Sequence, residues 1–203
     1  PEWFTLLPKN KKKVFVSMGS SGNQTCLKTI IKSFKNQDVT LIVAGAPTSL
    51  TLPKQDNVIV ASYLPAREVI RECDLVICNG GSPMVYLALA EGVCVLGIPS
   101  NMDQHLTMQA FANSQATRSL RSDALSTKQI RTLSQDLLTN PECKKNAQQL
   151  RAKISAQNAA RNFLLLFQSF ICKSPGTMIL NSTLTAVKEF ESEVATPPES
   201  TIH

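Results

Sequence analysis

The stretch Asn79-Gly80-Gly81-Ser82-Pro83 has the residue types of an anion-binding turn. An apolar run precedes it and a run with helical period follows, which predicts a strand, a tight turn and a helix. Ser82 suits the N-cap and Pro83 the first helical position. The first turn of a helix has unpaired N–H groups and about half a positive charge, and glycine lets an anion come close to them. A phosphate or pyrophosphate would fit here, but on these residues alone a plain tight turn explains the glycines equally well.

Two other turns carry polar side chains that could contact a ligand. Gly19-Ser20-Ser21-Gly22-Asn23 matches neither G-x-G-x-x-G nor the P-loop, which argues against a dinucleotide site or an ATPase of those types and leaves a flexible turn open. The segment Asp103-Gln104-His105 is the second. Taken alone, Asp103 is more simply explained as a helix N-cap than as a residue that binds sugar hydroxyls. A surface histidine is favoured for His105 over a general base without a partner.

The apolar runs before these turns predict the strands that position them. The runs are continuous rather than alternating, and helical segments separate them, which is typical of a parallel sheet buried on both faces. The expected fold class is α/β, a Rossmann-like parallel sheet flanked by helices, with ligands beyond the carboxyl ends of the strands. Strands are expected at 14–18, 39–44, 58–61, 74–78 and 93–98, and helices at about 24–35, 65–71, 82–91 and 104–113.

Beyond residue 120 the pattern is helical. Ser126 and Gln129 form a capping box, and Asn140-Pro141 begins another helix. We expect a linker-like lead-in at 1–12, one Rossmann-like domain with a helical C-terminal segment at 13–171, and a partly disordered tail at 172–203.

The composition indicates a globular protein, with 43% hydrophobic residues, 18% charged residues and a net charge of +6. The basic cluster at 9–13 has no interleaved aromatic residues, so nucleic-acid binding is disfavoured. Six cysteines without a C-x-x-C pair and only two histidines argue against zinc and favour a reducing, cytoplasmic location. No apolar stretch has the length of a membrane helix, and the N-terminus lacks the pattern of a secretory signal.

Two segments carry a family resemblance: VFVSMGSSG at 14–22, and ASYLPAREVIRECDLVICNGGSPMVYLALAEGVCVLGIPSNMDQ at 61–104 with the helical HLTMQAFA after it. From Pro1 to about Phe170 the chain resembles the C-terminal half of a GT-B glycosyltransferase, in the macrolide and UDP-glycosyltransferase group. Spacing from Tyr63 to Gln104 matches the donor-binding signature of that family without a gap. The resemblance implies that 13–171 binds a UDP- or dTDP-sugar as donor substrate, with no cofactor and no metal.

The resemblance also implies roles for single residues. Tyr63 falls where the family stacks an aromatic ring on uracil or thymine, and Leu64 where backbone atoms pair with the base edge. Asp103 and Gln104 fall where sugar hydroxyls are held, and Ser20 lies in the loop facing the donor phosphate and the reaction centre. The phosphate-gripping turn corresponds to Asn79, Gly81, Ser82 and Met84. With the resemblance, phosphate binding is favoured over a plain turn at Gly80-Gly81. For Asp103, binding of sugar hydroxyls is then favoured over capping of a helix.

The sequence departs from the family pattern in three places. The family has histidine at the position of Asn79, glycine or asparagine followed by threonine or serine where this chain has Pro83-Met84, and in plant members a ribose-binding glutamate at the position of Leu87. Each change removes a polar contact, so we expect a weaker hold on the donor.

The acceptor-binding half of the family, which usually supplies a histidine as catalytic base, has no counterpart in this sequence. The resemblance implies an inverting hexosyltransferase acting on a hydroxyl of a small lipophilic or lipid acceptor, with this chain as its donor domain and the catalytic residues unknown. The alternative is a non-catalytic truncated domain, or a subunit that needs a partner chain for activity. A sugar-nucleotide epimerase of the same architecture is less favoured.

Overall fold

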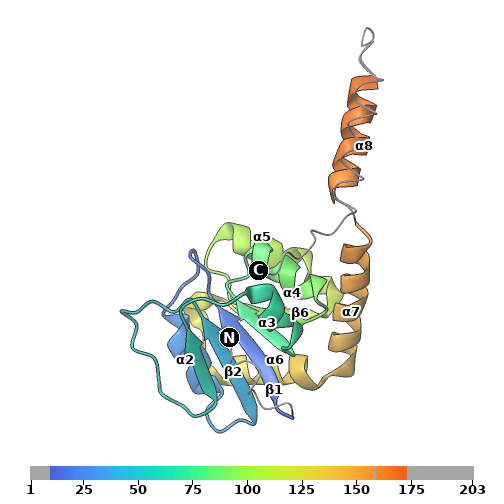
Figure 1. Ribbon diagram of the computed structural model, residues 1–203. Coiled ribbons are helices and arrows are strands. Elements are labelled where there is room, and N and C mark those ends of the chain that lie inside the picture. The colour runs from blue at the N-terminus through green and yellow to red at the C-terminus, as the bar shows by residue number, and fades with distance from the viewer. Residues whose placement is uncertain (1–9, 158, 173–203) are drawn as a thin grey trace, which may run out of the picture. The chain divides into compact units, whose positions relative to one another are not determined.

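The computed structural model describes residues 10–157 and 159–172. Within them, one parallel sheet of six strands has the order β3-β2-β1-β4-β5-β6 (Figure 1). The strands are β1 (Lys12–Ser17), β2 (Val39–Ala44), β3 (Val58–Ala61), β4 (Leu75–Cys78), β5 (Cys94–Gly97) and β6 (Thr117–Ser119). The parallel α/β sheet expected from the continuous apolar runs is confirmed. β6 was not expected, because three residues are too few to show a strand period.

Helices follow most strands, as β-α-β units require. They are α2 (Cys26–Ser33), α3 (Ala66–Arg71), α4 (Ser82–Ala90), α5 (Met102–Ala110), α6 (Thr127–Thr139), α7 (Pro141–Ser155) and α8 (Ala159–Cys172). Helix α2 contacts α6, and α4 contacts α3, α5 and α7. Right-handed crossovers place these two groups on opposite faces of the sheet (Figure 1). No helix in the described ranges is long and apolar enough to cross a bilayer.

The described residues fall into two units: residues 10–156 form one, and the part from Gln157 onward, which contains α8, belongs to the other. The lead-in expected at 1–12 lies outside the described residues as far as residue 9, and the expected tail lies outside them from residue 173.

The local signals in the sequence explain where several helices begin. Ser126 caps α6 by accepting a hydrogen bond from the Gln129 N–H, and Asn140 caps α7 by accepting one from the Glu142 N–H, so both expected caps are confirmed. The cap considered at Asp103 is wrong. Asn101 caps α5, and its Oδ1 accepts the Gln104 N–H at 3.1 Å, which puts Asp103 inside the first turn.

The core is formed by strands that are buried over their whole length. All six residues of β2 and all four residues of both β4 and β5 are buried. Burying both faces requires apolar side chains at successive positions, and this is why the runs are continuous. The sheet is therefore a rigid base for the loops at its two edges.

Burial of the thiols makes the stability of the domain dependent on pH. Desolvation raises the pKa of Cys73, Cys78 and Cys94 from 9.0 to about 12. Between these values the folded protein keeps thiol protons that the unfolded chain releases, so the free energy of unfolding falls as pH rises above 9. We expect urea denaturation to show lower stability at about pH 10 than at about pH 8. A Cys78→Ala variant should show a shallower decline, and an equal decline would contradict this origin.

Candidate functional site

The carboxyl ends of four neighbouring strands meet in one row of the sheet. Ser17 of β1 pairs with Cys78 of β4, Cys78 pairs with Gly97 of β5, and Gly97 pairs with Ser119 of β6. The loops that follow β1, β4 and β5 therefore leave the sheet at one level, side by side. These are the loops in which the sequence places its polar turns, so the fold brings them together.

The loop after β4 leads directly into the N-terminus of α4. The helix begins one residue earlier than expected: Gly81, not Ser82, is the N-cap. Ser82 is therefore the first helical residue and Pro83 the second. Pro83 has no N–H, and no described residue accepts a hydrogen bond from the N–H of Ser82 or Met84. The first turn contains no acidic residue. Two free N–H groups and the Ser82 hydroxyl thus remain available to an anion.

Both glycines of this loop have a structural reason. Gly80 has a φ of +78°, and a Cβ there would lie 2.8 Å from Cγ of Met108. A Cβ on Gly81 would lie 3.3 Å from Oδ1 of Asn79. Larger residues would push the loop away from the groups that it packs against. Gly80 and Gly81 therefore allow the tight turn, and because they have no side chains they also leave the N-terminus of α4 accessible to a ligand.

The side chains of Ser21, Asn79 and Gln104 join the three loops into one hydrogen-bond network. Asn79 Nδ2 and Gln104 Nε2 donate to Ser21 Oγ at 3.3 Å and 3.2 Å. Asn79 Oδ1 accepts the Gly81 N–H at 3.1 Å, within its own turn. Gln104 Oε1 accepts the Ser100 N–H at 2.8 Å and the Ser100 hydroxyl at 3.1 Å. Asn79 and Gln104 are buried, so these amides act as supports for the loops around the helix terminus.

The other expected site residues lie at the same edge of the sheet, on loops or, for Asp103 and Gln104, in the first turn of α5. Ser20 and Asp103 are exposed, and no described residue forms a hydrogen bond with either side chain. Tyr63 is 83% exposed in the segment between β3 and α3, whereas the side chain of Leu64 beside it is buried. The buried side chain of Leu64 fixes the backbone here, and the exposed ring of Tyr63 offers a flat apolar surface on which a base could stack. Gln104 is only 1% exposed, so its amide meets Ser21 and Ser100 rather than open solvent.

An ion-pair cluster fixes α3 relative to α4. Glu91 follows α4, and its side chain is 7% exposed. It forms an ion pair with Arg67 Nε at 3.1 Å and accepts a hydrogen bond from Arg71 Nε at 3.0 Å. Both arginines belong to α3, directly after the Tyr63-Leu64 segment. A shielded carboxylate with one arginine on each oxygen holds the two helices in register. The segment that presents Tyr63 is thereby kept in position relative to α4.

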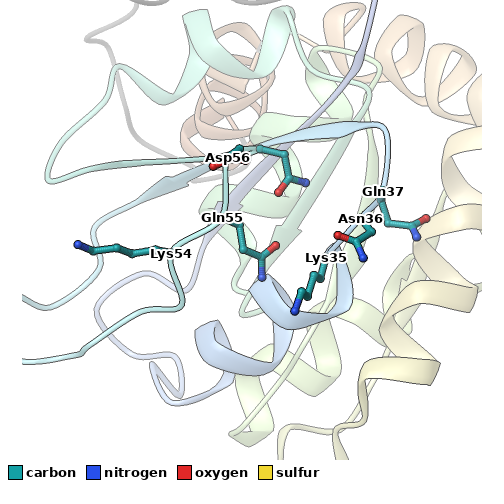
Figure 2. Close-up of a pocket in the computed structure, with 7 residues that line it drawn as sticks. Lys35, Asn36, Gln37, Lys54, Gln55 and Asp56 are labelled. Carbon is teal, nitrogen blue, oxygen red and sulfur yellow. The ribbon is translucent and has the colours of Figure 1, made fainter.

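A polar hollow of about 380 Å³ lies at the opposite edge of the sheet (Figure 2). It is lined by residues 35–37, which follow α2, and by residues 54–57, which precede β3. These segments lead into the amino ends of β2 and β3, so the hollow is not part of the polar loops at the carboxyl edge. Among the described residues, no group of His, Cys, Asp and Glu side chains is arranged to hold a metal ion.

The family model described as "Erythromycin biosynthesis protein CIII-like, C-terminal domain" matches residues 29–163. The chain belongs to this family of C-terminal domains of GT-B glycosyltransferases. The match covers β2 to β6, and with them the loop that opens α4. The resemblance stated for the sequence is therefore confirmed.

Related proteins agree with this family assignment. The chain is 35% identical over 150 residues to a PGL/p-HBAD biosynthesis glycosyltransferase of Mycobacterium tuberculosis, covering 74% of this chain and 35% of that protein. It is 29% identical over 172 residues to UDP-glycosyltransferase 2 of Phaeomoniella chlamydospora, covering 80% and 38%. Spinosyn rhamnosyltransferase complexed with thymidine diphosphate superposes with a TM-score of 0.70 at 22% identity, covering 83% of this chain and 48% of that one. The chain thus spans about a third of these curated relatives and half of this structure.

Within this EryCIII-like domain, the network identifies two residues that the sequence did not mark out. Ser21 was one hydroxyl among several in a loop, and only its contact with two buried amides distinguishes it. Asn101 could have been found as the cap of α5, because an asparagine three residues before Gln104 is a common N-cap pattern.

Proposed function

We propose that this domain binds the UDP- or dTDP-activated sugar of an inverting glycosyltransferase. The main observation is the opening of α4, where the N–H groups of Ser82 and Met84 are free at the carboxyl edge of a parallel sheet. Such a terminus attracts anions through its dipole and its unpaired N–H groups. A diphosphate is the part of a nucleotide sugar that needs such an environment most. The family membership supports the choice of a nucleotide sugar over other phosphates.

In this proposal, different residues bind the base, the diphosphate and the sugar of the donor. Tyr63 stacks on the base, and the backbone of Leu64 pairs with the base edge. Ser82 and Met84 hold the diphosphate, and Gly81, without a side chain, leaves room for it to approach. Ser20 lies in the loop after β1 that faces the donor phosphate and the reaction centre. Asp103 accepts hydrogen bonds from the sugar hydroxyls. Asn79 and Gln104 support this arrangement through Ser21, and neither has to leave its present hydrogen bonds to do so.

Sugar transfer itself requires a group that deprotonates the acceptor. In an inverting reaction the acceptor oxygen attacks the anomeric carbon, the bond to the diphosphate breaks, and the acceptor proton passes to a base. The amides at α4 stabilise the charge on the departing diphosphate, and no metal is needed for that step. His105 on α5 is the one histidine among the described residues, and none of these residues forms a hydrogen bond with its side chain. We propose that the base comes from an acceptor-binding half, on this polypeptide or on a partner chain, and that the acceptor is a small lipophilic molecule or a lipid.

Calorimetric titration of the full 203-residue chain tests the donor assignment. We expect UDP or dTDP to bind with a dissociation constant of about 1 mM or lower, and ADP to bind at least about tenfold more weakly because the base edge is selected. Absence of heat with both pyrimidine diphosphates at several times that concentration would contradict the assignment. Equal affinity for ADP would contradict the proposed role of Tyr63 and Leu64.

A further inference from the structure

The hydroxyl oxygen of Ser21 is the common acceptor for the side-chain amides of Asn79 and Gln104. Gly81 N–H can bond only to an acceptor, so the atom of Asn79 that faces it is Oδ1 and the NH2 group faces Ser21. The Ser100 N–H fixes the Gln104 amide in the same way, and its NH2 group also faces Ser21. The orientation of both amides therefore follows from backbone donors. Ser21 Oγ accepts two hydrogen bonds, one from the loop after β4 and one from the first turn of α5.

A hydroxyl oxygen has two lone pairs and one proton. With both lone pairs occupied, Ser21 Oγ has only its proton left to offer. No described residue accepts that proton, and Ser21 is exposed, so the O–H is directed to solvent or to a bound molecule. Two incoming hydrogen bonds also polarise the O–H and make it a stronger donor. The Ser21 hydroxyl can thus act toward a ligand only as a hydrogen-bond donor, and two buried amides hold it in place.

Further donors without a protein partner lie close to this hydroxyl. The amide of Asn79 alone separates Ser21 Oγ from the Gly81 N–H, and α4 begins at the next residue with the free N–H groups of Ser82 and Met84. A group that satisfies all of them must supply several acceptors over a short distance and carry negative charge. A diphosphate does both, whereas a neutral sugar or a base does not.

We propose that Ser21 is a binding residue for the diphosphate of the donor, through a charge-assisted hydrogen bond from its hydroxyl. This inference rests on the proposed function and adds to it a residue to which the family resemblance assigned no role. It also gives Asn79 and Gln104 a purpose without direct ligand contact, because they fix the direction of the Ser21 proton. The loop after β1 and the helix terminus after β4 then hold the diphosphate from two sides.

Two variants at Ser21 test the proposal, with calorimetric titration of UDP and of uridine, which lacks the phosphates. We expect Ser21→Ala to raise the dissociation constant for UDP at least about tenfold, because a hydrogen bond to a charged group is lost. Affinity for uridine should stay within about twofold, since the base contacts are elsewhere. Ser21→Thr keeps the hydroxyl and should restore UDP binding to within about threefold. The control Ser155→Ala removes an exposed hydroxyl on α7 and should change nothing.

The outcomes separate this proposal from the function on which it rests. If the wild-type chain binds UDP and Ser21→Ala binds it within twofold, Ser21 is not a diphosphate ligand and the donor site stands without it. Equal losses for UDP and uridine would show that the variant damages the loops as a whole, which also overturns the proposal. If the wild-type chain binds neither UDP nor dTDP, the proposed function fails first.

Discussion

Replacing Ser82 by glutamate is expected to leave the domain folded and to lower its affinity for UDP and dTDP by about 100-fold or more. The substitution puts a carboxylate in the first turn of α4, where the N–H groups of Ser82 and Met84 are free. A carboxylate there occupies the place of the diphosphate and repels it, and two unit charges 4 Å apart interact by about 4 kcal/mol at an effective dielectric constant of 20. Calorimetric titration measures the loss.

The same change should stabilise the helix slightly, by about 0.3–1 kcal/mol, because negative charge at an N-terminus is favourable. A variant with unchanged or higher stability that no longer binds would separate the site from the fold. Ser82→Gln is the matched control: similar in size but uncharged, it should lose less than about tenfold in affinity. If Ser82→Glu binds UDP as well as Ser82→Gln does, the diphosphate does not lie at this helix terminus.

Ile77→Ala is expected to lower the free energy of unfolding by about 3 kcal/mol, and more if the cavity does not relax. Ile77 is fully buried in β4, which pairs with both β1 and β5 at the centre of the sheet. Truncation removes buried apolar surface and leaves a void between layers that pack densely. Urea denaturation followed by circular dichroism measures the change.

Val60→Ala is the matched control for this loss. Val60 lies in β3, the edge strand of the sheet, and is 51% exposed, so its truncation should cost less than about 1 kcal/mol. Equal losses at the two positions would contradict the burial of β4 as the base of the site. Because β4 leads directly into Asn79 and Gly81, we also expect Ile77→Ala to weaken UDP binding, whereas Val60→Ala should not.

Most of the sheet could be predicted from the sequence because strands buried on both faces show as continuous apolar runs. β2 and β4 fall at or within one residue of the expected bounds. β6 could not be predicted, since Thr117–Ser119 is short, consists of polar residues, and is a strand only because β5 lies beside it. Caps are local, and this is why Ser126 and Asn140 were found.

The site was predictable where its chemistry is local and not where it depends on tertiary contacts. The opening of α4 is encoded in Gly81, Ser82 and Pro83, and the structure places the helix start there. The role of Ser21 depends on amides that come from positions 79 and 104, and no local pattern shows that they meet. The burial of Gln104 has the same origin.

Asn79 also illustrates how one departure from the family pattern is accommodated. A histidine at this position could donate to the diphosphate and carry charge, whereas Asn79 donates to Ser21 and accepts from Gly81. In the proposed site, the hydroxyl of Ser21 is the donor in place of an imidazole. We therefore expect a donor site that relies on hydrogen bonds from uncharged donors and on the helix terminus rather than on a cationic side chain.

The most direct test of the site is a two-dimensional ¹H–¹⁵N NMR titration of the chain with UDP. If the N-terminus of α4 holds the diphosphate, the amide resonances of Ser82 and Met84 shift in a saturable manner, and the resonances of residues 35–37 and 54–57 at the opposite edge stay in place. Unchanged Ser82 and Met84 resonances, or saturable shifts confined to that opposite edge, would contradict the proposed site.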